Sequence, residues 1–501
     1  MTFKKIRYHY FFYFLLALIY AFNLLDPISL TVVDLGRHIA NGRELLSGQT
    51  QVLFQNHYSY SMPEQRFVNH HWFFGAIVYL LEQIFGLAGP QLLNIVVLLI
   101  TLLLLLLMME KVSRPLISST LGLAVVLFLS MRSEIRPESI GLLFTTHTLW
   151  QLTKVIKNNH FSTGLMSLLL IQQLFWVNTH ISFVFGIFLV GLAWSCIMIL
   201  KSPKISGSLG KKLGMLLISL ILVSFINPNF IRGFLEPFNI LVDYGYSIVE
   251  NQTLAFLWRA INHSSFMWFL ALISVFIPLY LHNFRSLDWF ERILVIVGLV
   301  LGYQALRNVP LMTIFVMPTL AKLIWLEYQT IKKKISFDFS PNLLRLFVGQ
   351  LYILFILLSL TGIINPSVKL SNRRLGPIVE EAQAAQFIKN YPDASPIFNN
   401  YDLGSYLIYH LYPEHKIFVD NRPEAYSSNF FQDTYIPMQQ NPQVWKETAD
   451  QYDFGMIIFG VRDITPWARQ FISFMTDNPN WNNVYEDQFV IIWVKNKDET
   501  N

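Results

Sequence analysis

The sequence predicts an α-helical polytopic membrane protein that carries a C-terminal α/β domain outside the membrane. Of its 501 residues, 53% are hydrophobic and only 14% are charged, whereas soluble proteins carry about 25% charged residues. Long apolar runs recur from Phe11 to Ile364, and the mean hydropathy is +0.42. Runs of roughly 20 apolar residues are long enough to cross a bilayer, so a soluble or disordered chain is excluded.

Charge and cysteine content exclude further classes. The single cysteine, Cys196, lies in an apolar run, so neither an internal disulfide nor a cysteine-ligated zinc site is expected. The net charge is +5, but residues 365–501 are net acidic and the basic excess lies between the apolar runs. Such an excess sets membrane topology, so we expect no nucleic-acid partner. The oligomeric state is left open.

Eleven apolar segments are predicted to span the membrane within residues 1–364. The first follows Lys4, Lys5 and Arg7 and lacks a small-residue cleavage site, so it is interpreted as an uncleaved anchor. With the N-terminus in the cytoplasm, the lysine-rich connections become cytoplasmic, and residues 365–501 lie outside. The segments are 9–28, 89–109, 116–131, 138–155, 163–177, 181–200, 212–226, 264–282, 290–306, 309–326 and 342–364.

Two external loops are long. The first, at about 30–88, is predicted to hold two helices at the membrane surface, over 34–47 and 72–86. The helix over 34–47 has an amphipathic pattern. The apolar segment 72–86 is too short to span comfortably and is interpreted as interfacial. The second long loop covers about 227–263.

Residues 365–501 alternate between helical and strand patterns, which predicts a small extracytoplasmic α/β domain. The expected helices cover 380–390, 404–411, 442–452 and 465–475, and the expected strands cover 396–399, 416–420, 454–459 and 489–494. Loops at the carboxyl ends of strands are the usual ligand positions in such domains. Asp402, Asp420 and Arg422 are therefore predicted to form a ligand loop.

The basic residues on the predicted external side of the membrane part are all arginines, whereas the cytoplasmic side uses mostly lysine. Arginine grips phosphate with a planar, bidentate fork, so this bias indicates a phosphate ligand. The alternative is that these arginines pair with Glu134, Glu138 or Glu236. The arginines are Arg37, Arg43, Arg66, Arg132, Arg136, Arg232, Arg259 and Arg307, of which Arg136, Arg307 and Arg132 are the phosphate candidates.

Asp34 directly follows the first span and is the candidate catalytic carboxylate. A carboxylate at that depth is costly to place and can accept a proton from a hydroxyl. The alternative is a helix N-cap, because Asp is favoured there. Residues predicted to line the same site are His38, His70, His71, Glu138, Asn178 and His180. The histidines match no zinc motif, so a divalent metal is conceivable but not predicted.

Several motifs together resemble a known family. They are DLGRHIANGRELL, NHYSYS, NHHWFFGAIVYLLEQIFG, RPE, WVNTH, NPN, YDLGSYL and IFVDNRPE. In this order they resemble a group of bacterial polytopic proteins similar to the GT-C superfamily of membrane glycosyltransferases, which includes protein O-mannosyltransferases and aminoarabinose transferases. A second carboxylate is common after the first span in related enzymes, but here Leu35 follows Asp34.

The resemblance implies a GT-C-like fold in the plasma (inner) membrane and a role in the cell envelope. It implies transfer of a hexose or pentose from a polyprenyl-phosphate lipid to a carbohydrate, lipid or protein acceptor outside the cytoplasm. Asp34 would act on the acceptor, Arg136 and Arg307 would hold the donor phosphate, and no cofactor would be required. The alternatives are a transporter or flippase of a lipid-linked saccharide, and a non-catalytic envelope-assembly protein.

Overall fold

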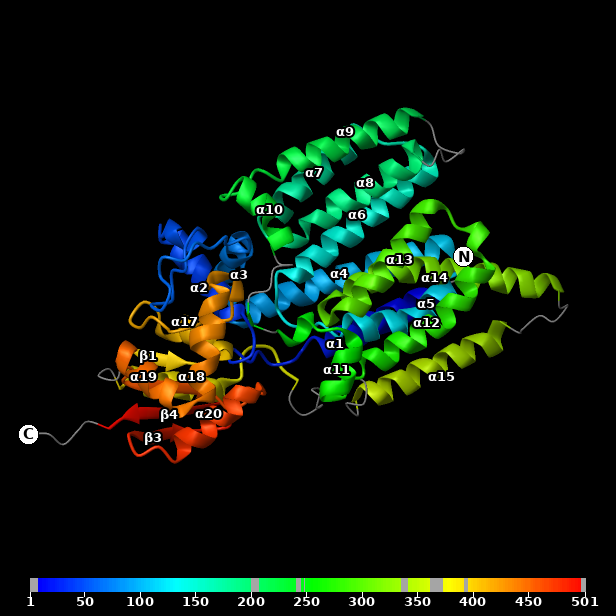
Figure 1. Cartoon of the computed structure of the whole chain (residues 1–501). Helices are drawn as coiled ribbons and strands as arrows, with labels where there is room; N and C mark the ends of the chain where they lie inside the picture. The colour runs from blue at the N-terminus through cyan, green and yellow to red at the C-terminus, as the bar shows by residue number, and fades with distance from the viewer. Residues whose placement is uncertain are drawn as a thin grey trace, which may run out of the picture.

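The computed structural model describes residues 8–199, 207–239, 245–246, 248–334, 341–360, 373–391 and 395–496. Figure 1 shows a bundle of long helices with a smaller part, which contains the sheet, at one end of it. The predicted domain boundary at residues 364 and 365 lies outside the described residues.

Each of the eleven predicted spans coincides with a helix. Within the described residues, four helical segments are long and apolar enough to cross a membrane by themselves: Ala88–Val112, Ile181–Met198, Ser265–His282 and Leu306–Lys334. The count of eleven spans therefore stays a prediction. The helices are α1 (Tyr8–Asn23), α4 (Ala88–Val112), α5 (Pro115–Leu129), α6 (Glu138–Asn158), α7 (Thr163–Val177), α8 (Val184–Met198), α9 (Gly207–Val223), α12 (Ser265–His282), α13 (Trp289–Gln304), α14 (Val309–Lys334) and α15 (Pro341–Leu360).

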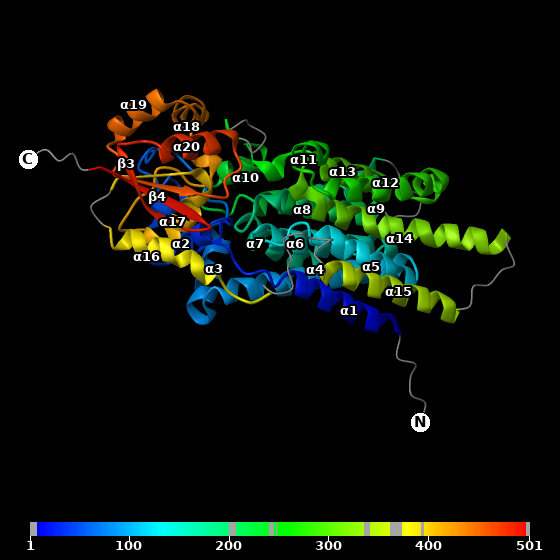
Figure 2. The same ribbon diagram turned by 90° about the horizontal axis from the view of Figure 1, so that it is seen from below.

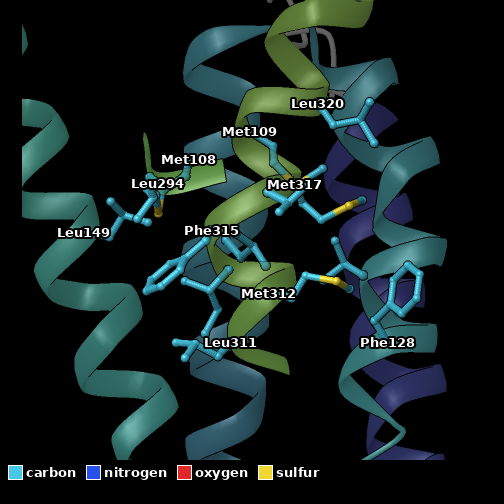
Figure 3. Packing of buried hydrophobic residues seen from close by; sticks show 14 of the residues in the cluster. Met108, Met109, Phe128, Leu149, Leu294, Leu311, Met312, Phe315, Met317 and Leu320 are labelled. Carbon is cyan, nitrogen blue, oxygen red and sulfur yellow. The ribbon is translucent and has the colours of Figure 1, made fainter. Parts of the chain in front are cut away.

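The helix α14 forms the centre of the bundle. Between Val309 and Leu323, residues on every face of this helix are buried, as expected for a helix that is apolar all round. Figure 3 shows Met312, Phe315 and Met317 of α14 packed among side chains of neighbouring helices. This packing fixes the short turn that precedes α14, which holds Arg307.

The predicted first external loop contains α2 (Leu35–Leu46), the short 3₁₀ turn η1 (Thr50–Leu53) and α3 (Trp72–Phe85), which confirms both predicted helices. Glycines allow these helices to approach closely. A Cβ at Gly42 would lie 2.2 Å from the Gly75 carbonyl oxygen of α3, and one at Gly36 would lie 2.7 Å from the Ser405 carbonyl oxygen. The helix α2 is therefore clamped between the first loop and the C-terminal part.

The predicted second external loop contains α10 (Ile231–Asn239), η3 (Val249–Asn251) and α11 (Leu254–Ile261). The C-terminal part has helices α16 (Ala382–Lys389), α17 (Gly404–Leu411), α18 (Ile436–Gln440), α19 (Pro442–Tyr452) and α20 (Pro466–Thr476). Its strands are β1 (Ile397–Asn399), β2 (Met456–Gly460), β3 (Trp481–Glu486) and β4 (Val490–Lys495), in the order β1-β2-β4-β3. The β1–β2 pair is parallel, and the other two pairs are antiparallel.

The prediction of a strand over 416–420 was wrong. Ile417 forms only an isolated bridge, with Ser59 of the first loop. Its amide donates to the Tyr58 carbonyl at 3.1 Å, and the Phe418 amide donates to the Asn399 side chain at 3.0 Å. The backbone groups of this segment are thus satisfied by the first loop and by a side chain rather than by the sheet. The strand β3 was not predicted.

One apolar core joins the first loop to the C-terminal part. It includes Leu35 and Ile39 of α2 together with Tyr406 and Leu407 of α17. Figures 1 and 2 both place α2 and α17 side by side at the same end of the helical bundle. Residue 34, at the start of α2, is thereby held where the bundle, the first loop and the C-terminal part meet.

Candidate functional site

Asp34 occupies the N-cap position of α2, but its side chain makes no capping hydrogen bond. Its carboxylate instead accepts a hydrogen bond from the Asn421 side-chain amide. Its Oδ2 atom also lies 3.6 Å from Arg136 Nη1 and 3.8 Å from Arg37 Nη2. The capping interpretation therefore does not explain this aspartate, and the carboxylate faces a cluster of arginines.

The charged turn between α5 and α6 contributes Arg132 and Arg136 to this cluster. Arg132 Nη1 lies 2.5 Å from Glu250 Oε2, and Arg136 Nη1 lies 2.9 Å from Glu250 Oε1. Burial raises the pKa of Glu250, but the charges of Arg136, Arg132 and Arg307 outweigh it, so the net pKa is lowered. Glu250 is ionised at neutral pH and holds the two guanidinium groups side by side.

Arg307 reaches the same cluster from the turn between α13 and α14. Its Nη2 atom lies 3.5 Å from Glu138 Oε1, and Nη1 donates a 2.8 Å hydrogen bond to Asn251 Oδ1. Arg132 Nη2 approaches Glu138 Oε1 at 3.8 Å. The structure therefore brings together Arg132, Arg136 and Arg307, the arginines predicted to bind phosphate. The pairing with Glu134 and Glu138, which was the alternative to a phosphate ligand, also occurs, and Glu236 accepts a hydrogen bond from Asn239.

The predicted histidines form a cluster of contacting rings beside the arginines, in which His71 and His180 are stacked. His38 and His71 lie 5.2 Å apart between ring centroids, His70 and His71 lie 3.9 Å apart, and His71 and His180 lie 5.3 Å apart. Burial lowers the pKa of His70 to about 3 and that of His180 to about 4, so these rings are neutral. In the part of the chain that the structure describes, no group of three or more His, Cys, Asp or Glu side chains is arranged to hold a metal ion.

Two connected cavities surround these residues. The first, here called the central cavity, measures about 560 Å³ and is lined by Asp34, the predicted histidines, Arg136 and Arg307. The second, here called the apolar cavity, measures about 540 Å³ and runs between helices of the bundle. Its apolar wall includes Leu98, Leu142, Phe185, Leu301 and Leu311. Both cavities are lined by Arg136, Glu138, His180, Ile181, Asn251 and Arg307.

Not every predicted residue lines these cavities. The Asn178 side chain accepts a 2.9 Å hydrogen bond from the Trp72 indole and donates to the Ile226 carbonyl, so it joins α3 to the turn after α9. Asp420 and Arg422 are almost completely buried and bind each other, with Arg422 Nη2 at 2.5 Å from Asp420 Oδ2. Asp402 is exposed. These four residues are absent from the walls of the central and apolar cavities.

The sequence reasoning missed Glu250, Asn251, Asn421 and Glu424, which all line the central cavity. Asn421 and Glu424 lie within the IFVDNRPE motif, directly beside the predicted Asp420 and Arg422, so the motif marked the correct loop. Glu250 lies in the second external loop, and a single carboxylate there gives no local signal of its long-range contacts.

Comparisons with known proteins identify the fold. No known family and no curated protein sequence matches the chain. Solved structures do match. The archaeal oligosaccharyltransferase AglB from Archaeoglobus fulgidus, in complex with an inhibitory peptide and a dolichol-phosphate, aligns with a TM-score of 0.65 and 11% identity over 100% of this chain and 75% of that chain. ArnT from Cupriavidus metallidurans in the apo state aligns with a TM-score of 0.52 and 14% identity over 96% of both chains.

The chain has the GT-C fold. The predicted resemblance to membrane glycosyltransferases is thus confirmed at the level of the fold. The apo Archaeoglobus fulgidus oligosaccharyltransferase agrees, with a TM-score of 0.61 and 11% identity over 91% of this chain and 70% of that chain. The alignments extend across the helical bundle and the C-terminal part, so both belong to the shared architecture.

Proposed function

We propose that the protein transfers a sugar from a polyprenyl-phosphate lipid to an acceptor at the external surface of the plasma membrane. One observation carries the proposal: Asp34, Arg136 and Arg307 line one cavity, and that cavity adjoins the apolar cavity, whose wall also includes Arg132. The donor's lipid chain would enter the apolar cavity, and its phosphate would bind at the shared wall. The AglB structure, which is a complex with a dolichol-phosphate, supports a lipid-phosphate ligand for this fold.

The proposed reaction is an inverting displacement at the anomeric carbon of the donor sugar. An acceptor hydroxyl forms the new bond to this carbon while the bond to the phosphate oxygen breaks, and the electron pair leaves with the polyprenyl phosphate. Arg132, Arg136 and Arg307 would stabilise the departing charge, which is usually the largest contribution to such catalysis. Asp34 would orient the acceptor at the anomeric carbon. The proposal requires no nucleotide or other soluble cofactor.

The arrangement of charge favours transfer over transport. Transporters commonly place ionisable residues near the membrane midplane. In this chain the charged cluster lies at the end of the bundle that faces the first loop and the C-terminal part. A cationic site that lies beside an apolar cavity and next to the C-terminal part suits a reaction at the headgroup of a lipid.

The test uses purified protein in nanodiscs and a panel of polyprenyl-phosphate sugars. Wild type should release sugar from at least one donor, and Asp34→Asn should reduce this release by about 100-fold while retaining the wild-type fold. Glu64→Gln, which alters an exposed carboxylate of the same loop outside both cavities, should release sugar at the wild-type rate. Donor binding without release from any member of the panel would contradict the proposal and favour transport.

A further inference from the structure

Glu424 lies where the central cavity meets a third cavity. This third cavity measures about 550 Å³, and its wall combines the first external loop, α10 and Glu424. It is polar on several sides, with Arg66, Asn229 and Arg232 among the lining residues. Glu424 is the residue that lines both cavities. The third cavity and the central cavity are therefore adjacent at this carboxylate.

The carboxylate of Glu424 differs from the other acids of the central cavity in its partners, because its hydrogen bond comes from its own backbone amide. Asp34, Glu138 and Glu250 each lie within 4.0 Å of at least one arginine nitrogen. Among the described side chains, none forms an ion pair or a hydrogen bond with the Glu424 carboxylate, although Arg37 and Arg422 act on it at longer range. The central cavity thus contains a carboxylate that is available to accept a proton from a substrate hydroxyl.

The loop that carries Glu424 is rigidly fixed. Its neighbour Arg422 is 1% exposed and binds Asp420, which is fully buried. Asn56 of the first loop donates a 3.0 Å hydrogen bond to the carbonyl of Ala425 and accepts a 2.9 Å hydrogen bond from Arg422. Burial raises the pKa of Glu424, which makes its carboxylate a better proton acceptor.

We propose that Glu424 accepts the proton of the acceptor's hydroxyl, and that the acceptor reaches it through the third cavity. This inference rests on the proposed transferase function and assigns its acceptor side. As the hydroxyl oxygen bonds to the anomeric carbon, its proton passes to the Glu424 carboxylate, and the electron pair of the broken bond leaves with the polyprenyl phosphate. The second carboxylate that is missing after Asp34 in the sequence is thus supplied by the C-terminal part. The polar wall of the third cavity suits a hydroxyl-rich acceptor such as a carbohydrate.

The test measures two reactions of one donor in nanodiscs: hydrolysis, in which water is the acceptor, and transfer to methyl glucoside. Glu424→Gln should slow both by about 100-fold or more while binding of polyprenyl phosphate stays at the wild-type level. Glu424→Asp should recover part of both activities. Leu235→Trp, which enlarges a 45% exposed side chain in the wall of the third cavity, should reduce transfer to methyl glucoside at least tenfold relative to hydrolysis.

The outcomes separate this inference from the proposed function. If Glu424→Gln hydrolyses the donor at the wild-type rate, or if Leu235→Trp transfers sugar to methyl glucoside as well as wild type does, the inference is overturned and the transferase proposal stands. If wild type binds donors but cleaves none of them, the transferase proposal fails and this inference fails with it. Glu64→Gln serves as the matched control, because it removes an exposed acid that lines none of the three cavities.

Discussion

Arg136 Nη1 lies 3.6 Å from Asp34 Oδ2. This contact joins the segment after the first helix to the turn before α6, and the same guanidinium binds Glu250 of the second external loop at 2.9 Å. The residue that orients the acceptor and the residue that binds the leaving group must flank one reacting carbon at near-contact distance. The separation of Asp34 and Arg136 therefore meets the geometric requirement of a single site.

We expect Arg136→Gln to destabilise the protein strongly. The side chain is 17% exposed and neutralises two carboxylates, and removal of one partner of a buried ion pair costs about 3 kcal/mol. Thermal unfolding of the detergent-solubilised protein measures the effect. Arg259→Gln, which alters an exposed arginine of α11, should change the stability by less than about 0.5 kcal/mol. Equal midpoints for the two variants would show that the cluster contributes nothing to folding.

Arg307→Gln should weaken binding of polyprenyl phosphate by about 10- to 150-fold, because a charge-assisted hydrogen bond contributes roughly 1.5–3 kcal/mol. Arg307 is 23% exposed and lies on the wall shared by the central and apolar cavities. Arg307→Lys should recover only part of the affinity, since lysine offers a point charge instead of a fork. Titration of undecaprenyl phosphate into nanodiscs provides the measurement. Wild-type affinity in Arg307→Gln would place the phosphate elsewhere.

The helices could be predicted from the sequence because the spacing of apolar residues and the length of an apolar run are local properties of the sequence. The short helix Gly404–Leu411 was likewise predicted with its observed bounds. The extended segment 416–420 was assigned to the sheet because its β-branched and aromatic residues look like a strand, and no local signal reveals that its amides bind Tyr58 and Asn399 instead. The local sequence pattern thus predicts whether a segment is helical or extended, whereas the segment that an extended chain hydrogen-bonds depends on residues far away in the sequence.

Part of the site could be predicted because charged residues directly beside apolar spans are unusual. Asp34, Arg132, Arg136 and Arg307 stood out for that reason, and the structure places them together. Asp420 and Arg422 had the same charged character but bind each other inside the C-terminal part. Their position next to Asn421 and Glu424 shows why residue type alone could not separate a structural pair from the cavity wall.

Arg422→Leu should detach the C-terminal part from the first external loop. Arg422 binds Asp420 and Asn56 in a site that excludes solvent, so its loss leaves Asp420 charged and unpaired at a cost of about 3–5 kcal/mol. The double variant Asp420→Leu/Arg422→Leu should recover much of that loss, because replacement of a buried ion pair by apolar residues is often neutral. Limited proteolysis combined with thermal unfolding measures both. A double variant no more stable than the single one would contradict this account.

Acidification should destabilise the protein through His180. Burial lowers its pKa from an ordinary value of 6.5 to about 4, so between these values the unfolded state binds a proton that the folded state does not. Stability therefore falls as the pH drops below 6.5, by up to about 1.4 kcal/mol per pH unit for this one group, until the folded pKa is reached. Above pH 6.5, His180 is neutral in both states and does not change the unfolding free energy as the pH rises. His180→Asn retains a polar side chain without a titrating ring, so its unfolding free energy should fall less steeply than that of wild type between pH 6.5 and 4. Denaturant titrations at half-unit pH intervals test this directly, and parallel slopes for the two proteins would show that His180 is not the group that titrates.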